Sequence, residues 1–134
     1  IITYLQNKSR PFIFSTFLSP GDIAAAQTAL AILRQEGPAY LQRLRSNTAY
    51  VRESLTAAGL PVIPGETPII PLVVGDAAKA NAIDFALRER GILISAIRPP
   101  TVAPGASRLR LTVTAAHTRE QLDTMLYGML QVWR

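Results

Sequence analysis

Residues 96–118 read AIRPPTVAPGASRLRLTVTAAHT, and this stretch joins two different backbone patterns. In RLRLTVT, residues 108–114, leucine and valine alternate with arginine and threonine. Such alternation is typical of a strand with one face packed and the other in water. Before it, Arg98 is followed by two prolines, which fix two φ angles and remove two backbone donors. We therefore predict a strand over 108–114 that is preceded by a stiff connection over residues 98–107.

Two helices are predicted upstream of these strands. The first begins after Ser19 as N-cap and stops at Gly37-Pro38, because a residue before proline is pushed out of helical geometry. The second has apolar residues three and four apart and ends at Gly59, which can supply a left-handed residue. Its predicted buried face consists of Leu41, Leu44, Thr48, Val51, Leu55 and Ala58.

Two further helices alternate with the strand candidates. AAKANAIDFALRER is capped by Asp76 and closed by Gly91, so Gly75-Asp76 is interpreted as a helix cap and not as a phosphate loop. The last helix starts with Thr118 and Gln121 at capping-box spacing. Its predicted core stripe is Leu122, Met125, Leu126, Met129, Leu130 and Trp133. The strand candidates are residues 69–74, 92–97 and 108–114, with a weaker one at 61–64.

This order predicts an α+β fold, in which helices pack on one face of a small antiparallel-type sheet. The 134 residues, 49% of them hydrophobic, suffice for one ordinary domain. The segment PFIFSTFL is apolar and aromatic but has no partner segment before the helices, so we expect it to be a contact surface at the end of something larger. The chain does not begin with methionine, and we expect the natural start to lie upstream.

Composition argues against several classes of function. No run approaches the ~20 apolar residues of a membrane span, so no membrane partner is expected. The net charge of +5 comes mostly from arginines scattered beside acidic or amide residues, so no nucleic-acid partner is expected. Cysteine is absent and His117 is the only histidine, which leaves no basis for a metal cluster or a classical triad. The lack of cysteine favours a cytoplasmic protein.

Arg98 is the principal candidate for a binding residue. A guanidinium that leaves a strand end on a stiff connection is suited to holding a carboxylate through two parallel hydrogen bonds, with Thr101 next to it. The alternative is that Arg98 pairs with an acid at a domain edge. Arg108 and Arg110 share one strand face, which is either an extension of an anionic site or a solvated or interdomain face. His117, just before the last helix, is interpreted as structural.

Three motifs, IRPPTV…RLRLTVTAAHT, RPFIFSTFLSP and PIIPLVVGD, occur in an order and at a spacing that resemble the C-terminal third of the α-oxoamine synthases. These are pyridoxal-phosphate (PLP) enzymes of aminotransferase fold type I. The resemblance implies that residues 1–19 are the tail of the large PLP-binding domain and that residues 20–134 are the small C-terminal domain. It also implies that Arg98 and Thr101 contact substrate, and that Ser15 and Thr16 reach the phosphate of PLP in the other subunit of a homodimer.

The implied activity is an acyltransferase that joins an acyl-CoA to an amino acid. The RPP element favours the member of the biotin pathway, with a pimeloyl thioester and L-alanine, although this chain has TVAPG where the family commonly has TVP-x-G. In this family the Schiff-base lysine lies upstream of the FST motif, and neither Lys8 nor Lys79 has a matching context. The chain alone is therefore expected to be inactive, with no catalytic residue of its own.

Three alternatives stay open. The chain can belong to another α-oxoamine synthase, such as a 2-amino-3-ketobutyrate ligase-like enzyme. It can be a free-standing split βαβ module that regulates or binds nucleic acid, although the strands lack the aromatic residues that such RNA-binding sheets present. It can also be a structural subunit that contributes Thr16 across an interface to a catalytic partner.

Overall fold

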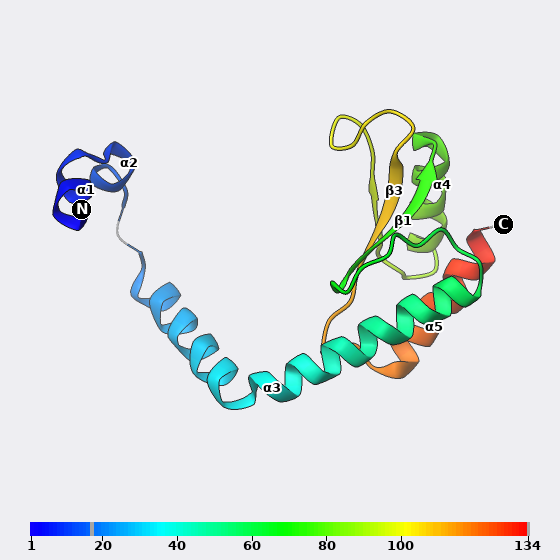
Figure 1. Cartoon of the computed structure of the whole chain (residues 1–134), viewed down its shortest axis with the longest axis horizontal. Coiled ribbons are helices and arrows are strands. Elements are labelled where there is room, and N and C mark those ends of the chain that lie inside the picture. Colours follow the sequence, from blue (N-terminus) through cyan, green and yellow to red (C-terminus); the bar gives the residue numbers. More distant parts are fainter. Residues whose placement is uncertain (17, 134) are drawn as a thin grey trace. The chain divides into compact units, whose positions relative to one another are not determined.

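The computed structural model describes residues 1–16 and 18–133, and it divides into two compact units, Ile1–Pro38 and Ala39–Arg134 (Figure 1). The first unit holds α1 (Ile2–Lys8), α2 (Arg10–Ile13) and the beginning of α3 (Pro20–Ala57). The second holds the rest of α3, followed by β1 (Ile69–Gly75), α4 (Ala77–Arg88), β2 (Ser95–Ile97), β3 (Ser107–Thr112) and α5 (Arg119–Val132).

Helix α3 continues through Pro38, so the prediction that a helix stops at Gly37-Pro38 and a second one follows was wrong. Proline disfavours a helical residue before it partly because its ring meets the Cβ of that residue. Gly37 has no Cβ, so this contact does not arise there, and apart from its two chain neighbours and the helix's own backbone no atom lies within 4 Å of the place where a Cβ would stand. Two costs of the proline remain, namely the missing N–H of residue 38 and the crowding of its ring against the carbonyl four residues earlier, while good helix formers continue on both sides.

The three strands form one antiparallel sheet in the order β1-β3-β2. Ile70 pairs with Leu111 and Leu72 pairs with Leu109, and these four side chains are buried on the same face. Arg108, Arg110 and Thr112 alternate with them and point to the opposite face, where Arg110 and Thr112 are exposed, as the alternation in RLRLTVT predicted. The weaker candidate at 61–64 contributes only an isolated bridge, Val62 with Leu72.

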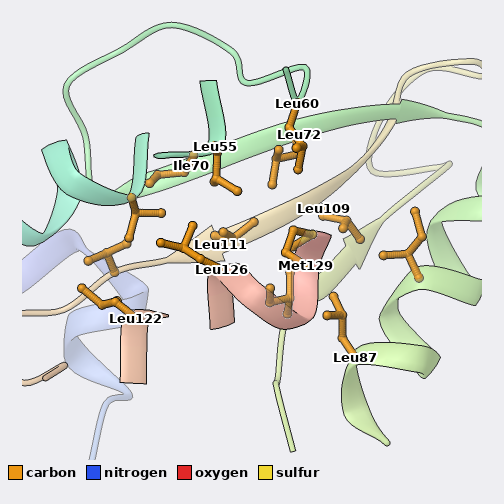
Figure 2. Packing of buried hydrophobic residues seen from close by; sticks show 14 residues of the cluster. Leu55, Leu60, Ile70, Leu72, Leu87, Leu109, Leu111, Leu122, Leu126 and Met129 are labelled. Atoms are coloured by element: carbon orange, nitrogen blue, oxygen red, sulfur yellow. The ribbon is translucent and has the colours of Figure 1, made fainter. Parts of the chain in front are cut away.

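Helices α3, α4 and α5 bury their apolar side chains against one face of this sheet, which confirms the predicted α+β fold. Figure 2 shows side chains from all three helices and from β1 and β3 pointing toward one another in a single cluster. The helix residues of that cluster are Val51, Leu55, Ile83, Leu87, Leu122, Leu126 and Met129. Removing such side chains from water is the main stabilising contribution, about 1.5–3 kcal/mol for each fully buried leucine or isoleucine.

The predicted stripes on the helices hold only in part. On α5, Met125 and Trp133 pack on the cluster, but Leu130 is 40% exposed. On α3, Leu41 is 46% exposed, whereas Thr48, Val51 and Leu55 are buried. The core face of α3 therefore begins later along the helix than the spacing of apolar residues indicated.

The predicted caps are present. Ser19 Oγ accepts the N–H of Asp22 at 3.1 Å, and Asp76 accepts the N–H of Lys79 at 2.7 Å. Thr118 and the side chain of Gln121 exchange hydrogen bonds in a complete capping box. Each cap satisfies backbone donors that a helix start leaves without a partner, an effect of about 1 kcal/mol.

Strand β2 is shorter than the predicted 92–97, because its first three residues are held elsewhere. The N–H of Ile92 donates to the carbonyl of Leu87 at 3.0 Å, at the end of α4. The Ile92 side chain fills the space that a Cβ on Gly128 would occupy. Residues 92–94 therefore follow the helices, and pairing with β3 begins at Ser95.

Among the residues described, none of the helices combines the length and the hydropathy that crossing a bilayer requires.

Candidate functional site

The connection between β2 and β3, residues 98–106, is referred to as the elbow. It starts where strand pairing ends, because Ile97 is the last residue of β2 and lies opposite Arg108. Its backbone closes two turns: the N–H of Thr101 donates to the carbonyl of Arg98 and the N–H of Ala106 donates to that of Ala103, each at 3.0 Å. Arg98 is therefore the first residue beyond the strand and is tied by its own carbonyl to Thr101.

The return arm of the elbow is anchored to the sheet. Arg108 donates from Nε to the carbonyl of Ala106 at 3.0 Å. A Cβ placed on Gly75, at the end of β1, would lie 3.6 Å from the carbonyl oxygen of Gly105, so the two backbones approach closely. Gly75 has a φ of 85°, a left-handed value that glycine adopts without strain. The elbow thus rests on the junction between β1 and α4.

The side chains of Arg98 and Thr101 are both exposed. Within the described part of the chain, no hydrogen bond or ion pair engages the Arg98 guanidinium, so the alternative of a pairing with an acid is not found there. An arginine in this position keeps its planar set of N–H donors available for a carboxylate.

Ser15 and Thr16 belong to the first unit and follow α2. Both are exposed, and Ser15 Oγ donates to the carbonyl of Thr16 at 3.3 Å, a long and weak hydrogen bond. Two accessible hydroxyls next to one another fit a phosphate, because each can donate a hydrogen bond to an oxygen. The pair is thus suited to the phosphate group that the sequence resemblance implies, while Arg98 and Thr101 lie in the other unit.

Neither of the two lysines is a candidate for a binding or catalytic role. Lys8 ends α1 and Lys79 lies in the first turn of α4, and both are exposed. Over residues 1–16 and 18–133, no group of three or more histidine, cysteine, aspartate or glutamate side chains could hold a metal ion.

Arg88 and Asp84, whose Nε and Oδ1 lie 2.6 Å apart on α4, form the one ion pair in the described ranges. The hydrogen bond that Asp84 accepts from Arg88, together with the negative charge of Asp84, raises the pKa of Arg88 above its ordinary value. This is an exposed pair one helical turn apart, which adds little to stability.

His117 has the contacts of a structural residue, as predicted. Its Nδ1 accepts the N–H of Thr114 at 3.1 Å, and its carbonyl accepts a hydrogen bond from Asn47 at 3.0 Å. Asn47 also donates to the carbonyl of Thr114, so one side chain of α3 holds the loop between β3 and α5.

Arg108 and Arg110 differ in spite of sharing a face of β3. Arg110 is exposed, whereas Arg108 is half-buried and hydrogen-bonded to Ala106.

Arg52 makes structural contacts that the sequence analysis did not predict. Its guanidinium donates at 3.0–3.1 Å to three carbonyls, those of Ile63, Thr67 and Ile69. These hydrogen bonds hold the loop before β1 against α3. Nothing in the sequence distinguishes Arg52 from the other arginines on helix faces, so this contact could not be predicted.

Comparison with known proteins places the chain in a class. Residues 1–127 match the family model of aminotransferase class I and II. The chain therefore belongs to this family.

Individual relatives narrow the class. The chain is 44% identical over 134 residues, 100% of its length and 34% of the relative's, to 8-amino-7-oxononanoate synthase of Symbiobacterium thermophilum. It is 46% identical over 123 residues to that of Lysinibacillus sphaericus, which covers 92% of this chain and 31% of the relative. With 8-amino-7-oxononanoate synthase 1 of Bacillus velezensis the identity is 42% over 126 residues, 94% and 32% of the two chains. The chain thus spans about a third of the length of these relatives.

Solved structures share the fold. Serine palmitoyltransferase of Sphingomonas wittichii superposes with a TM-score of 0.89 at 26% identity, over 98% of this chain and 33% of that one. A serine palmitoyltransferase solved with PLP gives 0.88 at 27% identity and the same coverage. The 8-amino-7-oxononanoate synthase of Francisella tularensis gives 0.79 at 25% identity, over 97% and 38% of the two chains.

Proposed function

We propose that this chain is the C-terminal third of an 8-amino-7-oxononanoate synthase. The complete enzyme would join a pimeloyl thioester such as pimeloyl-CoA to L-alanine, with release of carbon dioxide and free CoA, in the biotin pathway of the cytoplasm. Support comes from 42–46% identity to synthases of that name over at least 92% of the chain. The chain alone would be inactive, because the lysine that attaches PLP in this family lies in the upstream part.

One structural observation carries the proposed substrate contact: Arg98 stands exposed, without a partner among the described residues, at the start of an anchored elbow. In the complete enzyme it would hold a substrate carboxylate through paired hydrogen bonds, with Thr101 lining the same site. Holding the carboxylate would orient the substrate. Orientation lowers the activation barrier of the reaction because the entropy of bringing the reacting groups together is lost already on binding.

Bound PLP supplies an electron sink for the carbanion that such a condensation requires. The contribution of this chain would be Ser15 and Thr16, whose hydroxyls would donate to the cofactor phosphate of the other subunit in a homodimer. Residues 1–19 would then be the tail of the large domain, and residues 20–134 would be the small domain.

The test joins this chain to the upstream part of the Symbiobacterium relative, which matches the chain over all 134 residues. The proposal predicts that the joined protein forms 8-amino-7-oxononanoate from pimeloyl-CoA and L-alanine, whereas the upstream part alone does not. Spectroscopic evidence of bound PLP without any product from this pair would contradict the assignment.

A second α-oxoamine synthase activity is the alternative, because the serine palmitoyltransferases superpose at 0.88–0.89 and the Francisella synthase at 0.79. The same joined protein decides between them when glycine and L-serine are offered with short and long acyl-CoAs. A preference for L-serine with a long acyl chain would replace the biotin assignment.

A further inference from the structure

The segment before β2 and the strand β3 diverge, and a hollow opens where their pairing would continue. The last pair toward the hollow is Ser95 with Arg110, so a regular continuation would set Leu93 opposite Thr112. Instead, a hollow of about 710 Å³ is lined by residues 90–94, residues 111–113 and the first turns of α5. No backbone hydrogen bond joins Leu93 to Thr112 in the part of the chain described.

The backbone of Thr112 faces this hollow. The N–H of Val113 donates to the carbonyl of Pro68 at 2.9 Å, on the side of β1. Backbone groups alternate between the two sides of an antiparallel strand, so the N–H and C=O of Thr112 point the other way. A donor and an acceptor of the sheet thus meet the hollow without a strand partner.

The separation between residues 92–94 and β3 is maintained by the contacts that Ile92 makes with α4 and α5. Ile92 is fixed by its hydrogen bond to Leu87 and by its fit against Gly128, as described above. Residues 92–94 cannot close onto β3 unless Ile92 leaves α5. The next residue, Leu93, is 78% exposed at the rim.

A strand edge with an unpaired donor and acceptor beside an exposed leucine is the arrangement that accepts an added strand. The lining favours an occupant without net charge, because Arg90 and Glu120 balance in charge. Ile92 and Met125 contribute apolar surface to it, and Thr118, Gln121 and Thr124 contribute polar groups. The curated relatives are about three times as long as the matched chain, so they contain ample polypeptide beyond it.

We propose that an extended segment without charged side chains, from the upstream part of the complete protein, enters this hollow, pairs with the backbone of Thr112 and covers Leu93. The proposal rests on the proposed function in one respect, namely that the chain is part of a longer protein of the synthase type. It assigns an interaction surface to residues 92–94 and 111–113, none of which belongs to the elbow or to the Ser15-Thr16 pair.

Amide hydrogen exchange tests this directly. The chain alone is compared with the protein in which it is joined to the upstream part of the Symbiobacterium relative. The Thr112 amide is expected to exchange at least 10-fold more slowly in the joined protein. Unchanged exchange at Thr112 in a folded joined protein would overturn the proposal. If the joined protein does not fold, the upstream part is added in trans to the intact chain, and unchanged exchange there overturns it equally.

A pair of variants identifies the surface. Leu93→Asp places a charge at the rim, and Phe85→Asp places the same charge on α4 at a side chain that is 64% exposed and outside the hollow. We expect Leu93→Asp to abolish the protection of Thr112 and Phe85→Asp to leave it intact. Equal protection in both variants would show that Leu93 is not covered.

The outcome is separable from that of the proposed function. A protected Thr112 in a joined protein that makes no product would retain this surface and reject the assigned activity. An active protein with an unprotected Thr112 would retain the assigned activity and reject this surface.

Discussion

Ile92 occupies the space beside Gly128 that any other residue at position 128 would fill with its own Cβ. The contact joins α5 to the segment before β2, and Gly128 is buried. A glycine inside a helix costs about 1 kcal/mol relative to alanine, so its presence here is accounted for by packing and not by helix formation.

Gly128→Ala is therefore expected to destabilise the chain in spite of the better helix propensity of alanine. The added methyl group would displace Ile92, and overpacking of this kind costs about 1–3 kcal/mol. Urea unfolding followed by circular dichroism measures the change. Combining it with Ile92→Ala, which vacates the space, should recover part of the loss; additive losses would contradict the contact.

Arg52 should be a major anchor of the loop before β1. Arg52→Ala removes three donors from the carbonyls of Ile63, Thr67 and Ile69, and we expect a loss of about 2–3 kcal/mol in the free energy of unfolding. Arg45→Ala, at an exposed position on the same helix, is the matched control and should change stability by less than about 0.5 kcal/mol. Equal effects would refute the anchoring role.

Tyr50 links α3 to α5 in two ways, because its hydroxyl donates to Asp123 and the Arg119 guanidinium lies 3.3 Å from its ring centre. Tyr50→Phe removes only the hydrogen bond and should cost about 1 kcal/mol. Tyr50→Ala should cost distinctly more, since the stacked ring is also lost. Tyr127→Phe, at a side chain that is 68% exposed, is the control for removing a hydroxyl. A thermal melt in which all three variants match the parent would exclude the link.

Local patterns in the sequence predicted much of the fold. The alternation in β3 and the caps at Ser19, Asp76 and Thr118 are decided within a few residues, so they can be identified without knowledge of tertiary contacts. The continuation of α3 through Pro38 is favoured by the absent Cβ of Gly37, a compensation that a general rule about proline does not include.

The parts that could not be predicted depend on contacts between distant segments. The early end of strand pairing follows from Ile92 fitting against Gly128, 36 positions along the chain. The hollow beside Thr112 is a consequence of that divergence, so no motif marks it. At the candidate site, the position of Arg98 at the end of a strand followed from the prolines after it. Its exposure, and the contacts of Ala106 with Arg108 and of Gly105 with Gly75, required the structure.

The role of Arg98 as a carboxylate ligand is the central claim, and steady-state kinetics of the joined protein test it most directly. Arg98→Gln should lower kcat/KM by about 10- to 100-fold, because a charge-assisted pair of hydrogen bonds is lost, and Arg98→Lys should recover only part of it. Arg43→Gln, on α3 with its guanidinium over Tyr40, should behave as the parent. A kcat/KM for Arg98→Gln equal to that of the parent, with both substrates varied, would contradict the account.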